Sequence, residues 1–147
     1  MDNRTILNAL KMMSIFMGML GEKFRALAYE NAIESLAGIE NIETLTKQGT
    51  LTELEGVGST IEKKVIELIN TGKIKQLEQL KKKYPIDILS LIKLDGVGPK
   101  TIFRLYDELG VVDLTTLRQV CEEGKIAQLS RMGEKTQTNI LKSLKSI

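Results

Sequence analysis

A short phrase with two glycines recurs along the chain, and it constrains the fold more than any other feature. Leu54-Glu55-Gly56-Val57-Gly58 returns as Leu94-Asp95-Gly96-Val97-Gly98, and a weaker copy follows at Leu129-Ser130-Arg131-Met132-Gly133. Two glycines two residues apart permit a tight reversal of the backbone, because glycine accepts positive φ angles that side chains disfavour. Apolar residues with helical spacing follow each copy. The repeats therefore predict helices joined through a hairpin that the chain uses more than once.

The spacing of apolar residues indicates helices along most of the chain. From Ile6 to Leu20 they recur at three- and four-residue steps, which predicts an amphipathic helix over residues 3–20. The same spacing predicts a second helix from Phe24 to Leu36 and shorter helices near residues 74–83 and 86–92. The alternation that is typical of strands is rare. We therefore expect an all-α fold.

A lysine run before a proline suggests where the chain divides. Lys81-Lys82-Lys83-Tyr84-Pro85 would separate residues 1–84, which hold the first hairpin, from residues 85–147, which hold the other two. The alternative is a single continuous helical array, and the sequence alone barely separates the two.

The composition excludes several kinds of active site. The 147 residues include no histidine and one cysteine, Cys121, so a Ser-His-Asp or Cys-His arrangement, a His-ligated metal and an internal disulfide are excluded. A single cysteine fits an intracellular, reducing compartment. Lys11 interrupts the apolar start of the chain and no cleavage site follows, so we expect neither a signal peptide nor a membrane segment.

The hairpins are suited to holding a phosphate. Glycine lets a phosphate approach the backbone, and the helix that follows presents unpaired N–H groups with a partial positive charge. Lysines lie in the first turns of these helices: Lys63, Lys64, Lys100 and Lys135. A single hairpin of this kind is more often an ordinary turn, but its repetition favours binding to a phosphate backbone. Arg131 replaces the first glycine of the third copy, which we expect to serve packing only.

Lysines also gather around the first hairpin. The whole chain has 21 Lys and Arg against 19 Asp and Glu, a net charge of only +2. Residues 60–83 hold seven lysines and three glutamates, which leaves +4 on this segment. Such a segment is either a solvated helix face or a contact surface for nucleic acid.

The segments LEGVGSTIEKKVIELI and LDGVGPKTIFRLYDEL resemble helix-hairpin-helix motifs, which clamp the DNA backbone without reading its sequence. Phe24–Ala32 precedes the first hairpin, Thr71-Gly72-Lys73 follows its helix, and GEKTQTNILKSL lies near the end of the chain. This order resembles the amino-terminal part of X-family DNA polymerases, the DNA polymerase beta group, over nearly all 147 residues. It implies two small helical subdomains built on tandem motifs. Residues 1–84 would be a lyase-like DNA-binding domain, and residues 85–147 would hold one intact and one degenerate motif.

The resemblance implies chemistry at one lysine. In that family a lysine of the first hairpin helix forms a Schiff base with the 5′-deoxyribose phosphate left after incision of an abasic site, and β-elimination removes the sugar. The matching residue is Lys64. Without the resemblance we would interpret Lys64 as a solvated helix lysine. The implied DNA-binding residues are Arg25, Tyr29, Gly56, Gly58, Thr60, Lys63, Lys73, Lys75, Gly96, Gly98 and Lys100.

Three residues depart from the family pattern. Thr52, Thr60 and Gln76 stand where well-known members have basic residues. The 5′-phosphate pocket should therefore be less basic here, which argues against strong 5′-phosphate recognition and efficient lyase activity.

The family's hairpins also bind a monovalent cation, Na⁺ or K⁺, through backbone carbonyls. By position these carbonyls belong to Thr52, Leu54 and Val57 in the first hairpin and to Ile92, Leu94 and Val97 in the second. No other cofactor is implied.

The chain lacks the residues for DNA synthesis. The family's polymerase activity, a nucleotidyl transfer, needs a palm domain with an Asp-x-Asp pair, and no such pair occurs. We expect a part of a longer polymerase, with a palm in cis, or a stand-alone module. The implied partner is gapped, nicked or incised abasic DNA in repair, such as base excision, in whichever compartment holds the DNA.

Two other functions remain open. One is a non-catalytic helix-hairpin-helix scaffold, as in nucleotide-excision nucleases or ligases. The other is a helix-hairpin-helix glycosylase, because Val112-Asp113-Leu114 resembles the element with the catalytic aspartate of those enzymes. This element follows Gly98 too closely for that fold, so we favour the scaffold among the two.

Overall fold

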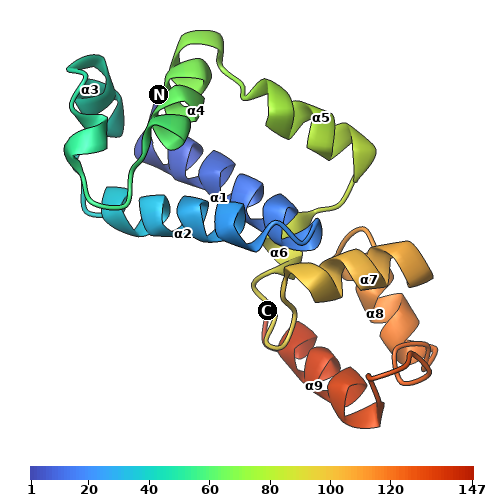
Figure 1. Ribbon diagram of the computed structural model, residues 1–147. Helices are drawn as coiled ribbons and strands as arrows, with labels where there is room; N and C mark the ends of the chain where they lie inside the picture. Colours follow the sequence, from blue (N-terminus) through green and yellow to red (C-terminus); the bar gives the residue numbers. More distant parts are fainter. The chain divides into compact units, whose positions relative to one another are not determined.

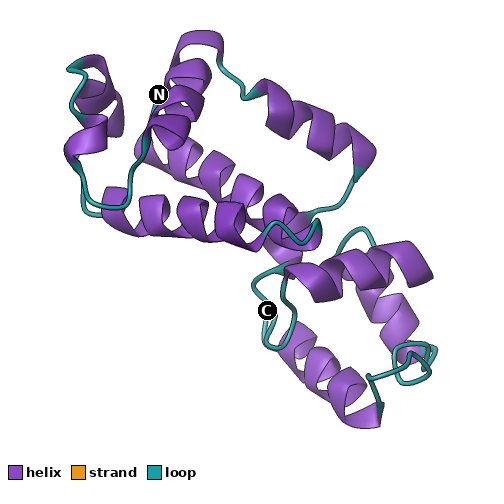
Figure 2. Ribbon diagram, viewed as in Figure 1, coloured by secondary structure: helices purple, strands orange, loops and turns teal.

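The computed structural model describes residues 1–147 and contains helices, turns and loops but no strand (Figures 1 and 2). The expected all-α fold is confirmed. The chain divides into two compact units, Met1–Tyr84 and Pro85–Ile147, and the division directly follows the lysine run at the end of a helix. No helix combines the length and the apolar character that crossing a membrane requires.

The first unit is organised around its amino-terminal helix. Its elements are α1 (Asn3–Met19), α2 (Lys23–Leu36), α3 (Ile42–Lys47), a 3₁₀ turn (Leu51–Glu53), α4 (Ser59–Thr71) and α5 (Lys75–Lys83). Figure 1 shows helix α1 beside α2. Helix α1 also packs against α3 and α5. Ile6, Leu10, Met13 and Phe16 of α1 are fully buried. Since an apolar side chain contributes about 2 kcal/mol when fully buried, this stripe holds the unit together.

The second unit has four helices, α6 (Ile88–Leu91), α7 (Pro99–Leu109), α8 (Leu114–Glu122) and α9 (Glu134–Lys145), and α8 packs on α9. Helix α6 is shorter than the predicted 86–92, because the Asp87 N–H donates to the Val112 carbonyl at 2.7 Å and holds the preceding backbone outside the helix. Cys121 of α8 is buried, and this burial, with a smaller contribution from Glu122, raises the pKa of its thiol to about 11. The thiol therefore stays protonated at neutral pH.

Two short helices, α3 and α8, were not predicted from the sequence. Both begin at a residue whose side chain accepts a backbone hydrogen bond: Asn41 from Thr44 at 2.9 Å, and Asp113 from Thr116 at 2.8 Å. Such caps satisfy the unpaired N–H groups of the first turn. An Asn or Asp followed by a helix-compatible stretch is the signal that would have located them.

All three hairpins share one backbone turn. In each, the residue between the glycine positions donates its N–H to the carbonyl of the leucine three residues earlier: Val57 to Leu54, Val97 to Leu94 and Met132 to Leu129, each at 3.2 Å. The residue before the donor has a positive φ in every copy: 89° at Gly56, 78° at Gly96 and 64° at Arg131. The third hairpin thus keeps the turn without its glycine, although a side chain in this conformation costs about 1 kcal/mol.

Candidate nucleic-acid interface

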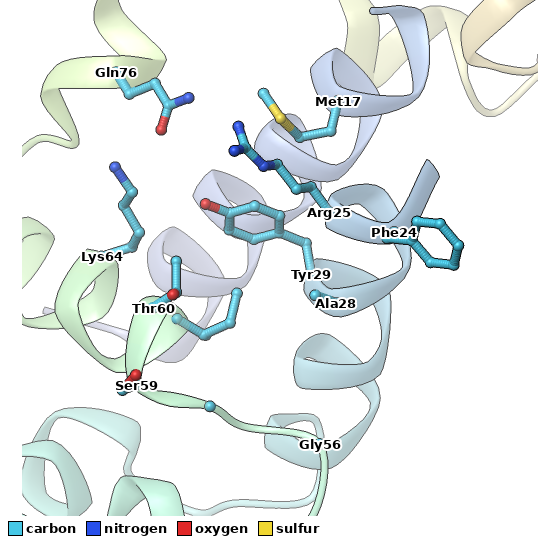
Figure 3. Close-up of a pocket in the computed structure, with 12 residues that line it drawn as sticks. Met17, Phe24, Arg25, Ala28, Tyr29, Gly56, Ser59, Thr60, Lys64 and Gln76 are labelled. Carbon is cyan, nitrogen blue, oxygen red and sulfur yellow. The ribbon is translucent and has the colours of Figure 1, made fainter. Parts of the chain in front are cut away.

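A cavity of about 560 Å³ opens beside the first hairpin (Figure 3). It brings together six of the predicted site residues: Arg25, Tyr29, Gly56, Gly58, Thr60 and Lys64. Gln76, one of the three departures from the family pattern, also lines it, together with Met17, Phe24, Ala28, Ser59 and Ile61. Helices α1, α2, α4 and α5 all contribute side chains, so residues far apart in sequence meet at one place.

The amino-terminal end of α4 opens into this cavity. The helix begins at Ser59 behind Gly58, which offers no side chain to cap it, and the first helical hydrogen bond is from Glu62 N–H to the Gly58 carbonyl at 3.0 Å. The N–H groups of residues 59–61 therefore find no acceptor within the protein. Free N–H groups at a helix start, together with the helix dipole, attract an anion such as a phosphate.

Two cationic side chains face the same space. Lys64 projects from α4 and Arg25 from α2, and Figure 3 shows both directed towards the region between the Tyr29 hydroxyl and the Gln76 amide. No carboxylate lines the cavity, so its electrostatic potential favours anions. Lys64 is half-buried, whereas Arg25 is exposed.

Tyr29 supplies a hydroxyl that stays protonated. Its side chain is 4% exposed. This burial raises the pKa of the Tyr29 hydroxyl, the charge of Arg25 opposes the increase, and Glu67 adds to it. Tyr29 is therefore a neutral hydrogen-bond donor at physiological pH, which suits contact with a phosphate oxygen.

Glu67 fixes the position of α5 beside the cavity. Its carboxylate accepts a hydrogen bond at 2.7 Å from the backbone N–H of Lys75, in the first turn of α5. Ile74, at the start of that helix, has no capping side chain, so the carboxylate from α4 caps it instead. This bond places Gln76 at the cavity wall.

Other predicted residues lie elsewhere. Lys63 is exposed on α4 and does not line the cavity, and Lys73 and Lys75 line a separate shallow groove. Gly96, Gly98 and Lys100 belong to the second unit, where α7 begins behind Gly98 without a side-chain cap, in the same manner as α4.

The backbone carbonyls proposed for a monovalent cation are in part free. The carbonyls of Thr52 and Val57 accept no hydrogen bond, and that of Leu54 accepts one, from Val57. In the second hairpin the carbonyls of Ile92 and Val97 likewise accept no hydrogen bond, and the carbonyl of Leu94 accepts one from the Val97 N–H. Hard cations prefer oxygen ligands such as backbone carbonyls that accept no other bond, so these carbonyl oxygens fit Na⁺ or K⁺.

Phe24 is a site residue that the sequence interpretation missed. Its spacing predicted only that it belongs to a helix, but Phe24 is 89% exposed at the edge of the cavity and projects away from Lys64 (Figure 3). An exposed aromatic ring beside a phosphate site offers a stacking surface for an unpaired base. Its position directly before Arg25 was the available signal.

Asp113, the residue that suggested a glycosylase, has a structural role. The backbone N–H of Thr116 donates to its carboxylate at 2.8 Å and the Thr116 hydroxyl donates at 2.9 Å. These bonds, in that order of importance, hold the pKa of Asp113 below its usual value. The carboxylate caps α8 and lies outside the cavity of the first unit.

Known proteins resemble the chain over both units. Residues 1–74 match a family model described as "Helix-hairpin-helix domain", and residues 88–146 match one described as "SAM-like Helix-hairpin-helix tandem". The chain is 32% identical over 145 residues to DNA polymerase/3'-5' exonuclease PolX of Bacillus subtilis (strain 168), covering 98% of this chain and 25% of the relative.

More distant relatives match smaller parts. The identity to DNA polymerase lambda of Arabidopsis thaliana is 29% over 118 residues, covering 79% of this chain and 21% of that protein. A segment of 55 residues is 36% identical to the Holliday junction branch migration complex subunit RuvA of Acidovorax sp. (strain JS42), covering 37% of this chain and 29% of the relative. The chain thus spans about a quarter of the length of these relatives.

Proposed function

Because the chain belongs to the helix-hairpin-helix family, in the arrangement of X-family DNA polymerases, we propose that it binds the DNA backbone without reading base sequence. The expected targets are gaps, nicks and incised abasic sites, where a strand ends in a 5′-phosphate. One observation carries this proposal: Lys64, Arg25 and the uncapped start of α4 surround a single cavity without a carboxylate.

Each part of the cavity has a role in this proposal. The free N–H groups at the start of α4 and the Arg25 guanidinium bind the terminal phosphate, and the Tyr29 hydroxyl donates to one of its oxygens. Phe24 stacks on a base that the gap leaves unpaired. A monovalent cation on the hairpin carbonyls would add positive charge near a backbone phosphate. Gly96, Gly98 and Lys100 bind a second stretch of backbone through the start of α7.

We further propose a lyase reaction at Lys64. Its neutral amine attacks the C1′ aldehyde of the 5′-deoxyribose phosphate, and loss of water gives an iminium ion. Removal of a proton from C2′ gives an enamine. Its electrons then form a C2′–C3′ double bond and restore the iminium as the C3′–O bond breaks, and the DNA strand leaves with its 5′-phosphate. Water then hydrolyses the imine, which releases the sugar and restores the lysine.

A non-catalytic scaffold is the second candidate, and the neutral residues of the cavity favour it. Thr60 and Gln76 both line the cavity and carry no charge, so Lys64 and Arg25 are its only cationic side chains. A cavity with two cations holds a phosphate less tightly than one with four, and binding alone would then be the function.

Binding assays test the shared part of both candidates. We expect the chain to bind gapped duplex DNA with a 5′-phosphate at least tenfold more tightly than the same DNA with a 5′-hydroxyl, since one charge-assisted contact contributes about 1.5–3 kcal/mol. Affinity should fall steeply with salt concentration and should not depend on base sequence. A strong sequence preference, or equal affinity for the two ends, would contradict the proposal.

Restoring positive charge to the cavity should strengthen recognition of the 5′-phosphate. We expect Thr60→Lys and Gln76→Lys each to raise the preference for a 5′-phosphate over a 5′-hydroxyl by about tenfold, because each adds one charge-assisted contact. Gln48→Lys is the matched control, since Gln48 is exposed and does not line the cavity. Fluorescence anisotropy with the two DNA ends measures the preference. If the control raised it equally, overall charge would be the cause.

A further inference from the structure

The groove beside α5 has its own lysines, separate from the cavity that contains Lys64. It measures about 240 Å³ and is lined by Lys73, Lys75, Glu78, Gln79 and Lys82. Gln76, next in sequence to Lys75, lines the larger cavity instead. Helix α5 therefore borders both the cavity and the groove, of which only the cavity has a role in the proposed function.

The three lysines that end α5 differ in their partners. Lys81 pairs with Glu78 at 3.4 Å, and the Lys83 ammonium lies 5.6 Å from the centre of the Tyr84 ring. Lys82 forms no ion pair and lines the groove. Since Glu78 is the only carboxylate of the groove and Lys81 offsets its charge, the groove keeps a positive excess. Lys73 and Lys75 are also exposed and without an ion pair.

We propose that this groove binds the sugar-phosphate backbone of the duplex that flanks the gap or nick, an inference that rests on the DNA binding proposed above. Lys75 and Lys82 lie two helical turns apart, an axial distance of about 10 Å. This separation is wide enough for each ammonium group to contact a different phosphate of one strand.

The lining of the groove favours a duplex over a single strand. Sites for single strands combine positive charge with aromatic rings on which bases stack. This groove has no aromatic or apolar residue, so it offers no surface on which a base could stack. The aromatic ring beside the larger cavity, Phe24, lies outside it. The two faces of α5 would thus divide the DNA, with the strand end on one face and the flanking duplex on the other.

Paired lysine substitutions test this proposal. Lys75→Gln/Lys82→Gln removes two groove charges, and Lys47→Gln/Lys125→Gln removes two lysines that pair with Glu43 and Glu123, none of which lines the groove. For gapped DNA with a long flanking duplex, we expect the slope of log affinity against log salt to fall by about 1.8 in the groove variant, or 0.9 per phosphate contact. The control should keep the wild-type slope.

Comparing gapped with single-stranded DNA distinguishes binding in the groove from a general effect of positive charge. Binding to a single-stranded oligonucleotide with a 5′-phosphate should be equal in the groove variant and the control, and circular dichroism should show equal helix content. Two results would overturn the groove proposal alone. One is an equal decrease of the salt slope in the groove variant and the control on gapped DNA. The other is a decrease of the groove variant's slope on the single strand that equals its decrease on gapped DNA. A wild-type chain without salt-dependent binding to gapped DNA would overturn the proposed function and the groove together.

Discussion

Lys64→Ala should abolish covalent trapping of the chain on 5′-incised abasic DNA in the presence of borohydride, reducing the trapped product at least 100-fold. Borohydride reduces the imine between an amine and the sugar aldehyde to a stable bond, so trapping reports Schiff-base formation itself. Alanine is a strong helix former, so α4 should remain folded. Trapped protein is measured by gel electrophoresis with labelled DNA at saturating protein concentration.

Two further variants separate chemistry from charge. Lys64→Arg keeps the positive charge but forms no imine, so it should bind the DNA and give no trapped product. Lys63→Ala removes the neighbouring lysine, which is exposed and lies outside the cavity, and should still give trapped product at saturation. Trapping that persisted in Lys64→Ala would exclude Lys64 as the nucleophile. A wild type that binds the 5′-phosphate without trapping would leave the scaffold as the function.

Gly56→Ala should destabilise the first unit by about 3 kcal/mol, a large part of the stability of a small domain. Two costs add. Gly56 has φ +89°, where a side chain costs about 1–2 kcal/mol. A Cβ atom there would also lie 2.9 Å from Ser35 Oγ and 3.1 Å from the Asn31 carbonyl oxygen, and such overpacking costs about 1–3 kcal/mol.

The second hairpin provides the matched control. Gly96 has a similar φ of +78°, but a Cβ atom there would meet nothing within 4 Å, so Gly96→Ala should cost only about 1 kcal/mol. Urea unfolding followed by circular dichroism, with amide exchange in α4 and α7, measures both effects. Ser35→Ala in the Gly56→Ala background should restore part of the loss. Equal costs at the two glycines would show that α2 yields to the new methyl group.

The glycine pairs and the apolar spacing were sufficient to predict the all-α fold and the principal helices. The short helices α3 and α8 were missed because six- and nine-residue segments rich in threonine carry little helical periodicity, and their start depends on caps from Asn41 and Asp113. The third hairpin was interpreted as degenerate because Arg131 is not glycine. Its backbone nevertheless adopts the same turn, since the surrounding contacts outweigh a cost of about 1 kcal/mol.

The sequence predicted only some of the residues that line the cavity. Lys64 and Arg25 came from a resemblance between sequences, because their spacing alone does not reveal a tertiary contact. The exposure of Phe24 could not be predicted, since its spacing predicts only that it belongs to a helix. The function of Glu67 as a cap for α5 depends on the path of the chain after α4, which no local pattern encodes.

Helices α4 and α7 begin behind a glycine, and this makes the stability of the chain depend on bound nucleic acid. Helices α1, α3 and α8 receive their caps from Asp2, Asn41 and Asp113, whereas α4 and α7 receive none from their own sequence. Glycine in place of a capping side chain costs a few tenths of a kcal/mol per helix. In our proposal the phosphates of DNA supply those caps, so the bound chain should withstand heat and proteases better than the free one. Glycine at these two positions then leaves the helix starts open to the phosphates, because a built-in cap would compete with the ligand.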